Sequence, residues 1–154
     1  NEPTFQKITF SSNILFGSDE IVLNEKGKDA LWKVGSILKR NMGNIREIQI
    51  QGHADTNPSN RYRSNMQLAA MRAITVFNYL KDELKIDPAD HLISTTSFGE
   101  FKPVQRSEDD DRYDGRQLRY HNQTDELRER NRRIELLLFY RYLEDGSLNS
   151  TRRN

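Results

Sequence analysis

Two side chains of opposite charge stand where a single cleft could hold both. Asp55 follows an expected short strand over residues 48–51, and Arg72 lies about two turns into an expected helix that opens near Asn65. If this helix packs back on the strand, the two charges line one cleft. A carboxylate accepts hydrogen bonds from an ammonium, and the planar fork of an arginine binds a carboxylate, often in a bidentate manner. The pair could therefore hold a zwitterion, but spacing alone leaves an ion pair between Asp55 and Arg72 equally open.

The polar residues next to this pair have both structural and binding interpretations. Ser64 and Asn65 could cap the helix, whose first N–H groups would then face a ligand carboxylate; plain capping is favoured for Ser64. His53 follows Gly52 at the strand end, and we expect it to orient the turn through a hydrogen bond. The chain has 3 histidines at unrelated spacings, which suggest neither a metal set nor a serine–histidine–aspartate triad.

Further charged groups lie near the end of the chain and in its loops. Arg132 and Arg133 open the last expected strand, where alternation would direct Arg132 to the cleft and Arg133 away from it. Residues 61–63 read Arg-Tyr-Arg and could stack on a sugar or a base, although exposed loop polarity is the favoured interpretation. Residues 108–111 are all acidic but lack the spacing of a calcium loop, so we interpret them as a solvated charge run.

Hydrophobic periodicity predicts the elements that position these residues. Strands are expected over residues 4–16, 45–51, 93–98 and 133–142, and helices over residues 25–40 and 65–84. Asn24 is the predicted N-cap of the first helix. The expected buried stripes of the two helices are Ala30, Leu31, Val34, Ile37 and Leu38, and Leu68, Ala69, Ala73, Val76, Phe77 and Leu80. The order βαβαββ predicts crossover connections and an α/β (α+β) sandwich, with helices packed on a sheet.

Composition limits the classes of protein to consider. The chain has 154 residues, 34% of them hydrophobic and 31% charged, which is enough for one domain with a modest core. A net charge of +1 argues against a general nucleic-acid binder. The lack of cysteine excludes thiol catalysis and disulfides. Because the chain begins at Asn1 rather than Met, we expect a piece of a longer protein whose anchor or export signal lies elsewhere.

Several short motifs occur together in an order typical of one family. They are Gly52-His53-Ala54-Asp55, then Asn65, Leu68-Ala69 and Arg72-Ala73, then Gly99 and Pro103, and finally Asn131-Arg132-Arg133-Ile134-Glu135. Over residues 8–138 the chain resembles the OmpA C-terminal, or OmpA/MotB-like, peptidoglycan-binding domain. The Ser64-Asn65 start of the helix and a long polar loop are more similar to the MotB side of that family.

The resemblance implies a fold, a ligand and a location. It implies a mixed four-stranded sheet with helices packed on it, in a domain over residues 1–143 followed by a flexible tail at 144–154. It implies non-covalent binding of peptidoglycan through the diaminopimelate of the stem peptide, with no catalysis, no cofactor, no metal and no nucleic acid. The host would be periplasmic and anchored in the inner or outer membrane, for example as a MotB-like stator subunit, a lipoprotein or an outer-membrane barrel. Stator-type relatives act as pairs, so a homodimer is also considered.

The resemblance also assigns roles to five residues. Asp55 would take the diaminopimelate ammonium and Arg72 its carboxylate. Asn65 and Leu68 would line the pocket, and Arg132 would support the carboxylate side.

The chain departs from the family pattern in three places. Ala54 replaces a usual Thr or Ser, Gly17 stands where many members have Asp, and the polar insertion at residues 105–130 is longer than usual. Two other functions stay open. One is an enzyme acting on wall peptide or sugar through Asp55 or Glu100. The other is a nucleic-acid module using residues 61–63 and the arginines between positions 112 and 133.

Overall fold

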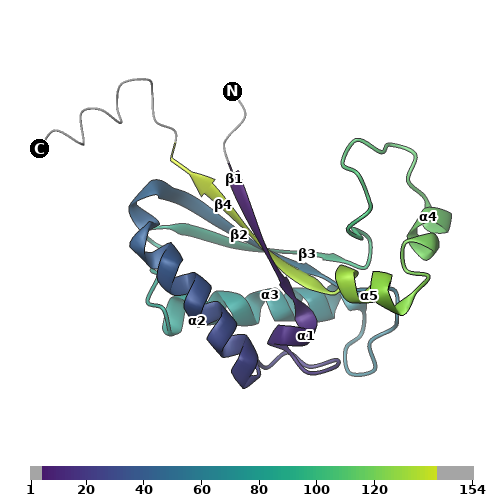
Figure 1. Ribbon diagram of the computed structural model, residues 1–154, viewed down its shortest axis with the longest axis horizontal. Helices are drawn as coiled ribbons and strands as arrows, with labels where there is room; N and C mark the ends of the chain where they lie inside the picture. The colour runs from purple at the N-terminus through teal and green to yellow at the C-terminus, as the bar shows by residue number, and fades with distance from the viewer. Residues whose placement is uncertain (1–4, 142–154) are drawn as a thin grey trace, which may run out of the picture.

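The computed structural model describes residues 5–141, which form a four-stranded mixed sheet with helices on one face (Figure 1). In chain order the elements are β1 (Phe5–Ser11), α1 (Ser12–Leu15), α2 (Glu25–Arg40), the 3-10 turn η1 (Met42–Asn44), β2 (Ile45–His53), α3 (Asn65–Asp82), β3 (Leu92–Gly99), α4 (Gly115–Tyr120), α5 (Asp125–Asn131) and β4 (Arg133–Tyr140). The strand order is β1-β4-β2-β3, with β2 and β3 parallel and β4 antiparallel to both neighbours. The expected mixed sheet and its strand–helix alternation are confirmed.

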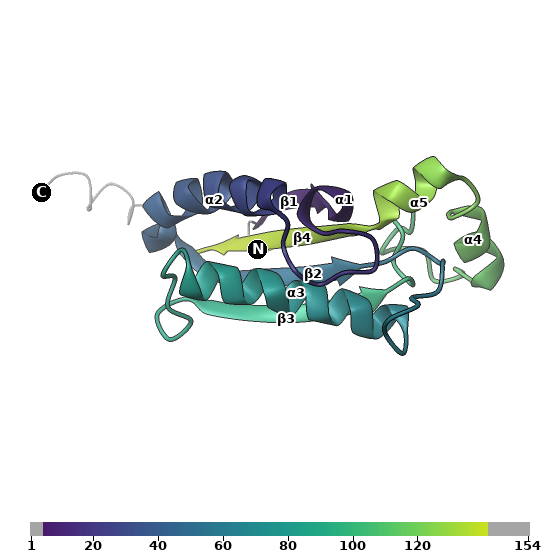
Figure 2. The same cartoon turned by 90° about the horizontal axis from the view of Figure 1, so that it is seen from below.

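The core lies between the sheet and its two long helices. Figure 2 shows α2 and α3 side by side on one face of the sheet, with α4 and α5 gathered at one end. Alternate residues of each strand point toward the helices. The wholly buried side chains at the centre include Ile48, Ile50, Ala73, Val76, Ile134, Leu136 and Leu138. None of the helices within residues 5–141 is long and apolar enough to cross a membrane.

Helix α2 occupies the residues that the sequence predicts, but Ile37, a member of its expected stripe, lies outside the buried face. The side-chain oxygen of Asn24 caps the helix, as expected. Ile37 was expected to be buried and is 56% exposed, whereas Gly35 is buried. A Cβ at Gly35 would lie 2.0 Å from Cδ1 of Leu84, so the glycine lets Leu84 pack closely against the helix. This contact centres the buried stripe on the Gly35 side and leaves Ile37 on the solvent side.

The predicted first strand is too long, because β1 ends at Ser11 and the next four residues form the helical turn α1. The hydroxyl of Ser11 accepts a hydrogen bond from the N–H of Asn13 at 3.3 Å, and the N–H of Ser12 donates to the carbonyl of Arg132 at 3.0 Å. A serine in this position starts a helical turn. The chain therefore leaves the sheet at Ser11 and enters the loop that precedes α2.

The polar insertion at residues 105–130 contains two short capped helices. Asp114 and Gln117 form a capping box at the start of α4, and Thr124 caps α5. The expected tail at residues 144–154 lies outside the described residues.

Gly52 lies within β2, which continues to His53, so the predicted turn at these two residues is wrong. Helix α3 crosses the strand so closely that a Cβ at Gly52 would lie 2.1 Å from the carbonyl oxygen of Ala69. The obstacle is main chain of a buried helix and cannot move aside easily. Gly52 therefore sets how near α3, which carries Arg72, approaches the strand that leads to Asp55.

We predict that Gly52→Ala destabilises the fold by about 1–3 kcal/mol or more, because the added methyl overpacks the contact with α3. Gly43→Ala is the matched control, since a Cβ there meets no atom within 4 Å. Urea unfolding of both variants measures the difference. Equal midpoints for the two variants would contradict the close approach of α3 to β2.

Candidate functional site

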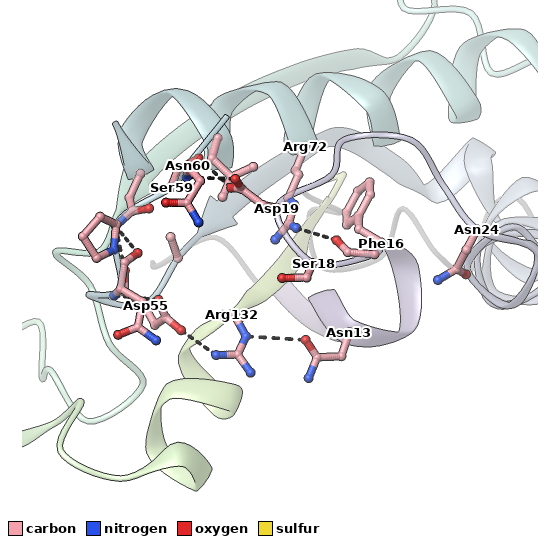
Figure 3. Close-up of a pocket in the computed structure, with 16 residues that line it drawn as sticks. Asn13, Phe16, Ser18, Asp19, Asn24, Asp55, Ser59, Asn60, Arg72 and Arg132 are labelled. Carbon is pink, nitrogen blue, oxygen red and sulfur yellow. Dashed lines mark hydrogen bonds and ion pairs between the residues drawn. The ribbon is translucent and has the colours of Figure 1, made fainter. Parts of the chain in front are cut away.

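A cleft of about 660 Å³ opens where β2 ends and α3 begins (Figure 3). Its walls come from the loop between α1 and α2, the loop between β2 and α3, the first turns of α3, and the residue before β4. The five residues expected from the sequence, Asp55, Asn65, Leu68, Arg72 and Arg132, all line this cleft. Figure 3 shows the labelled side chains of Asp55, Arg72 and Arg132 around the same hollow.

Main-chain carbonyl groups hold Arg72 in the cleft. The side chain is only 5% exposed; its Nε donates to the carbonyl of Glu20 at 2.8 Å and an Nη donates to that of Gly17 at 3.1 Å. Its guanidinium carbon lies 4.9 Å from the ring centre of Phe16. Burial lowers the pKa of Arg72 below its ordinary value, with the charge of Asp19 opposing this change. Arginine stays protonated in proteins, so the cleft contains a cation bound to carbonyls rather than to a carboxylate.

Asp55 has partners other than Arg72. It is 5% exposed. One carboxylate oxygen accepts from the N–H of Asn57 at 2.9 Å, and the other pairs with Arg132 at 2.5 Å. In residues 5–141 no ion pair forms between Asp55 and Arg72. The spacing left two alternatives open, an ion pair between Asp55 and Arg72 or a cleft that both residues line. In the structure both residues line one cleft and do not pair with each other.

Arg132 lies on the Asp55 side of the cleft. Besides its pair with Asp55, its Nε contacts the side-chain oxygen of Asn13 at 3.4 Å. The role expected from the family resemblance, support of a ligand carboxylate, stays a prediction. Arg133 points to the other face of the sheet, as strand alternation predicts, and only 4% of it is exposed.

The start of α3 is fixed by two neighbouring polar residues. Ser64 caps the helix by accepting from the N–H of Gln67 at 3.1 Å, as expected. The amide of Asn65 donates to the carbonyls of Asp55 and Asn57, at 3.1 and 3.0 Å, and also lies 3.0 Å from a carboxylate oxygen of Glu100. Asn65 therefore joins the helix to the loop that carries Asp55.

Asp19 and Asn13 also line the cleft, although no sequence motif predicts them there. Asp19 belongs to none of the motifs that the sequence offers. Its carboxylate bonds to Ser59, Asn60 and Arg61, residues about forty positions away. The local sequence gives no sign of partners so distant, and Asn13 lay within the expected strand.

The histidine of the motif belongs to a second polar cluster on the opposite face of the sheet. His53 lies next to Arg133 in the register of β2 and β4, and its ring stacks on Phe98 at 5.2 Å. Its Nε2 contacts the amide oxygen of Gln51 at 3.3 Å, so it does not hydrogen-bond a turn as expected. Burial, and then the charge of Arg133, lowers the pKa of His53 to about 3. The imidazole is neutral at physiological pH and lies away from the cleft.

Arg133 and Glu135 form the charged centre of this second cluster. Nε of Arg133 donates to Glu135 at 2.6 Å, and its other nitrogens donate to the carbonyls of Asn131 and Lys102 at 3.2 and 3.0 Å. Burial raises the pKa of the Glu135 carboxyl, but the hydrogen bond from Arg133 outweighs it, so the pKa lies below its ordinary value. The cluster fixes the segment that carries Arg132 into the cleft.

The remaining candidates lie at the surface. Arg61 and Arg63 are exposed and Tyr62 is half-buried, and none of the three lines the cleft. Within residues 5–141 no group of three or more histidine, aspartate and glutamate side chains is arranged to hold a metal, and this includes the acidic run at 108–111.

Comparison with known proteins gives one family match and several similar structures. A model of the OmpA family matches residues 15–117. Motility protein B of Bacillus subtilis (strain 168) is 29% identical over 136 residues, which are 87% of this chain and 45% of that protein. This chain therefore spans less than half the length of that relative.

Three solved structures share the fold. A putative MotB-like protein from Desulfovibrio vulgaris superposes with a TM-score of 0.71 at 23% identity, covering 91% of this chain and 76% of that one. The periplasmic domain of Helicobacter pylori MotB gives a TM-score of 0.68 at 20% identity, with 94% and 82% covered. The cell wall anchor of the T6SS from Pseudomonas aeruginosa gives 0.67 at 23% identity, with 89% and 82% covered.

We predict that Glu135→Gln lowers the free energy of unfolding at pH 7 by about 3 kcal/mol, because it leaves the buried Arg133 cation without its counter-charge. A carboxyl whose pKa is lowered by folding stabilises the protein above its ordinary pKa, and this stabilisation is lost as the pH falls through the lowered value. The variant should therefore lose less stability than the parent on acidification below about pH 4.

Urea unfolding at pH 7 and at pH 3 measures both effects. Glu25→Gln is the control, because the Glu25 side chain is 90% exposed and its one ion pair among residues 5–141 is with the surface residue Lys28. A similar small change in both variants would show that the Arg133–Glu135 pair does not hold this end of the sheet.

Proposed function

Because this chain belongs to the OmpA family, we propose that it binds peptidoglycan non-covalently and recognises the zwitterionic end of diaminopimelate in the stem peptide. The observation that carries the proposal is the separation of charge in the cleft. Asp55 and Arg72 are both 5% exposed, line the same space and bond to different partners. A ligand with an ammonium and a carboxylate on one carbon has one group for each of these two charges.

Asp55 is the proposed acceptor for the ammonium. A carboxylate offers about four lone-pair sites, and the two oxygens of Asp55 each have one partner, Asn57 or Arg132. A ligand ammonium can therefore bind Asp55 without breaking either contact. The side-chain amide of Asn65 donates to the main-chain carbonyl of Asp55. This bond fixes the backbone at Asp55, so the carboxylate keeps its direction when the ligand arrives.

Arg72 is the proposed donor to the ligand carboxylate. Carbonyls of Gly17 and Glu20 occupy one edge of the guanidinium and leave N–H groups for a second, anionic acceptor. A charge-assisted hydrogen bond contributes about 1.5–3 kcal/mol, which corresponds to a factor of roughly 10 to 100 in affinity. A stem peptide with lysine in place of diaminopimelate has an ammonium but no carboxylate at this point, so it would lose the Arg72 contact.

A membrane-attached host is the proposed setting. The relative at 29% identity is a motility protein B, and a similar fold occurs in a protein described as a cell wall anchor. On this basis we propose that the domain acts in the periplasm and ties a protein of the inner or outer membrane to the wall, with a MotB-like stator subunit as one host. A homodimer belongs to the same proposal.

We propose binding without bond cleavage. The two carboxylates considered as an acid or base are engaged, Asp55 with Arg132 and Glu100 with the amide of Asn65. Incubation of the domain with purified wall, followed by analysis of soluble fragments, should release none. Nucleic-acid binding is not favoured, because the 24 basic residues are balanced by 23 acidic ones.

We predict that the domain binds a soluble muropeptide containing diaminopimelate at least about tenfold more tightly than the same muropeptide containing lysine. Asp55→Asn should weaken binding to both ligands, since both carry the ammonium. Arg72→Lys should weaken mainly the diaminopimelate ligand, because it keeps the charge and loses the planar fork. Calorimetric titration of each variant with each ligand measures these differences.

Two conservative exposed substitutions serve as controls. Asp29→Asn and Arg40→Lys lie on α2 outside the cleft and should bind as the parent does. Equal affinity of the parent for the two muropeptides would refute recognition of diaminopimelate. Unchanged pulldown by insoluble wall in both Asp55→Asn and Arg72→Lys would refute the role of this cleft.

A further inference from the structure

Asp19 ties together the two loops that form opposite walls of the cleft. Its carboxylate accepts a hydrogen bond from the hydroxyl of Ser59 at 2.5 Å and from the N–H groups of Asn60 and Arg61 at 2.9 and 2.8 Å. These three bonds, which we call the Asp19 clasp, join the loop before α2 to the loop before α3. Figure 3 shows Asp19 beside Ser59 and Asn60 at the edge of the pocket.

The loop that carries the clasp also holds Arg72. The carbonyls that accept from the guanidinium belong to Gly17 and Glu20, on either side of Asp19 in the chain. Residues 17–20 therefore bind Arg72 through main-chain carbonyls. The same four residues bind the opposite wall of the cleft through the side chain of Asp19. Movement of this loop away from residues 59–61 would take the Arg72 acceptors with it.

The backbone at Asp19 indicates why a carboxylate matters here. Asp19 has φ of 57°, in the left-handed region where glycine is the least strained residue and Asp or Asn is tolerated. A glycine would satisfy the backbone at this position more easily, but it could make none of the three side-chain bonds. The cost of this conformation is offset by contacts that reach across the cleft.

We propose that Asp19 is a positioning residue for recognition of the ligand carboxylate: the clasp holds the 17–20 loop against the opposite wall and thereby fixes the direction of the Arg72 guanidinium. The inference rests on the proposed function of the cleft. A donor that is already oriented binds more tightly, because less freedom is lost when the ligand arrives. Asp19 touches no ligand in this scheme; it acts through the loop and Arg72.

The charge of Asp19 also affects ligand binding directly, in the direction opposite to the clasp, and the experiment must distinguish the two effects. A carboxylate near the cleft repels an incoming carboxylate, so its removal could strengthen binding if the clasp had no role. The hydrogen bond from Ser59 and those from the loop N–H groups lower the pKa of Asp19 below its ordinary 3.8. The carboxylate is therefore ionised, and the clasp closed, down to acidic pH, and the clasp is lost only as the pH falls through the lowered value.

The decisive variant is Asp19→Asn, which keeps a side chain tolerated at positive φ and replaces one acceptor oxygen by an NH₂ group. We expect affinity for the diaminopimelate muropeptide to fall by about five- to tenfold. Affinity for the matched lysine muropeptide should change by less than about twofold, because that ligand has no carboxylate for Arg72 to bind. A merely structural role would weaken both ligands equally.

Amide hydrogen exchange provides a readout that needs no ligand. The N–H groups of Asn60 and Arg61 should exchange faster in Asp19→Asn than in the parent, while those at the centre of β2 keep their protection. Asp19→Gly, which relieves the backbone and deletes the whole clasp, should show the same pattern more strongly. Asp29→Asn, the same chemical change on the exposed side of α2, should alter neither exchange nor affinity.

The outcomes separate this inference from the function it rests on. If the parent does not distinguish the two muropeptides, the proposed function fails and the inference fails with it. If the parent does distinguish them but Asp19→Asn binds as tightly or more tightly, only the positioning role is refuted. If Asp19→Asn weakens both ligands to the same extent, Asp19 stabilises the domain without orienting Arg72, and the inference is also overturned.

Discussion

The site depends on how Arg72 is held: carbonyl oxygens of the main chain, not a carboxylate, accept its hydrogen bonds. A carbonyl fixes the direction of a guanidinium without cancelling its charge. Had Asp55 been the partner, the two charges would have neutralised each other, and a zwitterionic ligand would have had to break a buried ion pair to enter. Asp55 instead forms an ion pair with Arg132. The cleft therefore keeps an acceptor and a donor at separate places, both largely shielded from water.

The fold produces this separation through ordinary features of strands and helices. Gly52 brings α3 close to β2, and so brings Arg72 near the end of the strand that leads to Asp55. Strand alternation sends two consecutive arginines to opposite faces of the sheet. Arg132 reaches the cleft. Arg133 is buried on the opposite face with Glu135, and it also donates to the carbonyls of Asn131 and Lys102. The far face of the sheet thus supports the position of a residue on the cleft side.

The sequence predicted the parts of the site that depend on local pattern. Periodicity placed α2, and the residues of α3 that approach the sheet followed from the same rule. The position of Asp55 just after a strand, and of Arg72 in the helix that follows, predicted that both side chains lie at one end of the sheet. Family motifs then distinguished a shared cleft from an ion pair, which spacing could not do. The position of Asn65 in the cleft has a physical basis, because its amide bonds to the loop on which Asp55 lies.

What the sequence did not predict depends on contacts between distant residues. Asp19 accepts hydrogen bonds from residues 59–61, and no local sequence pattern predicts partners about forty positions away. Ile37 fits the helical stripe, yet the close contact of Gly35 with Leu84 leaves it in solvent. The early end of β1 at Ser11 depends partly on a hydrogen bond to Arg132. In each case the local preference was weak and a tertiary contact decided the outcome.

The direction of the sheet relates the cleft to the proposed anchor. β1 begins at Phe5, which pairs with Phe139 near the end of β4, and it finishes at Ser11, which pairs with Arg133 beside the cleft. The strand advances about 3.3 Å per residue, so the cleft lies roughly 20 Å along the sheet from the place where the chain enters β1 and leaves β4. These strand ends, through which the proposed anchor would be joined, are therefore at the opposite end of the sheet from the cleft. The cleft would then face away from the membrane and toward the wall, which is the orientation that a tether between the two requires.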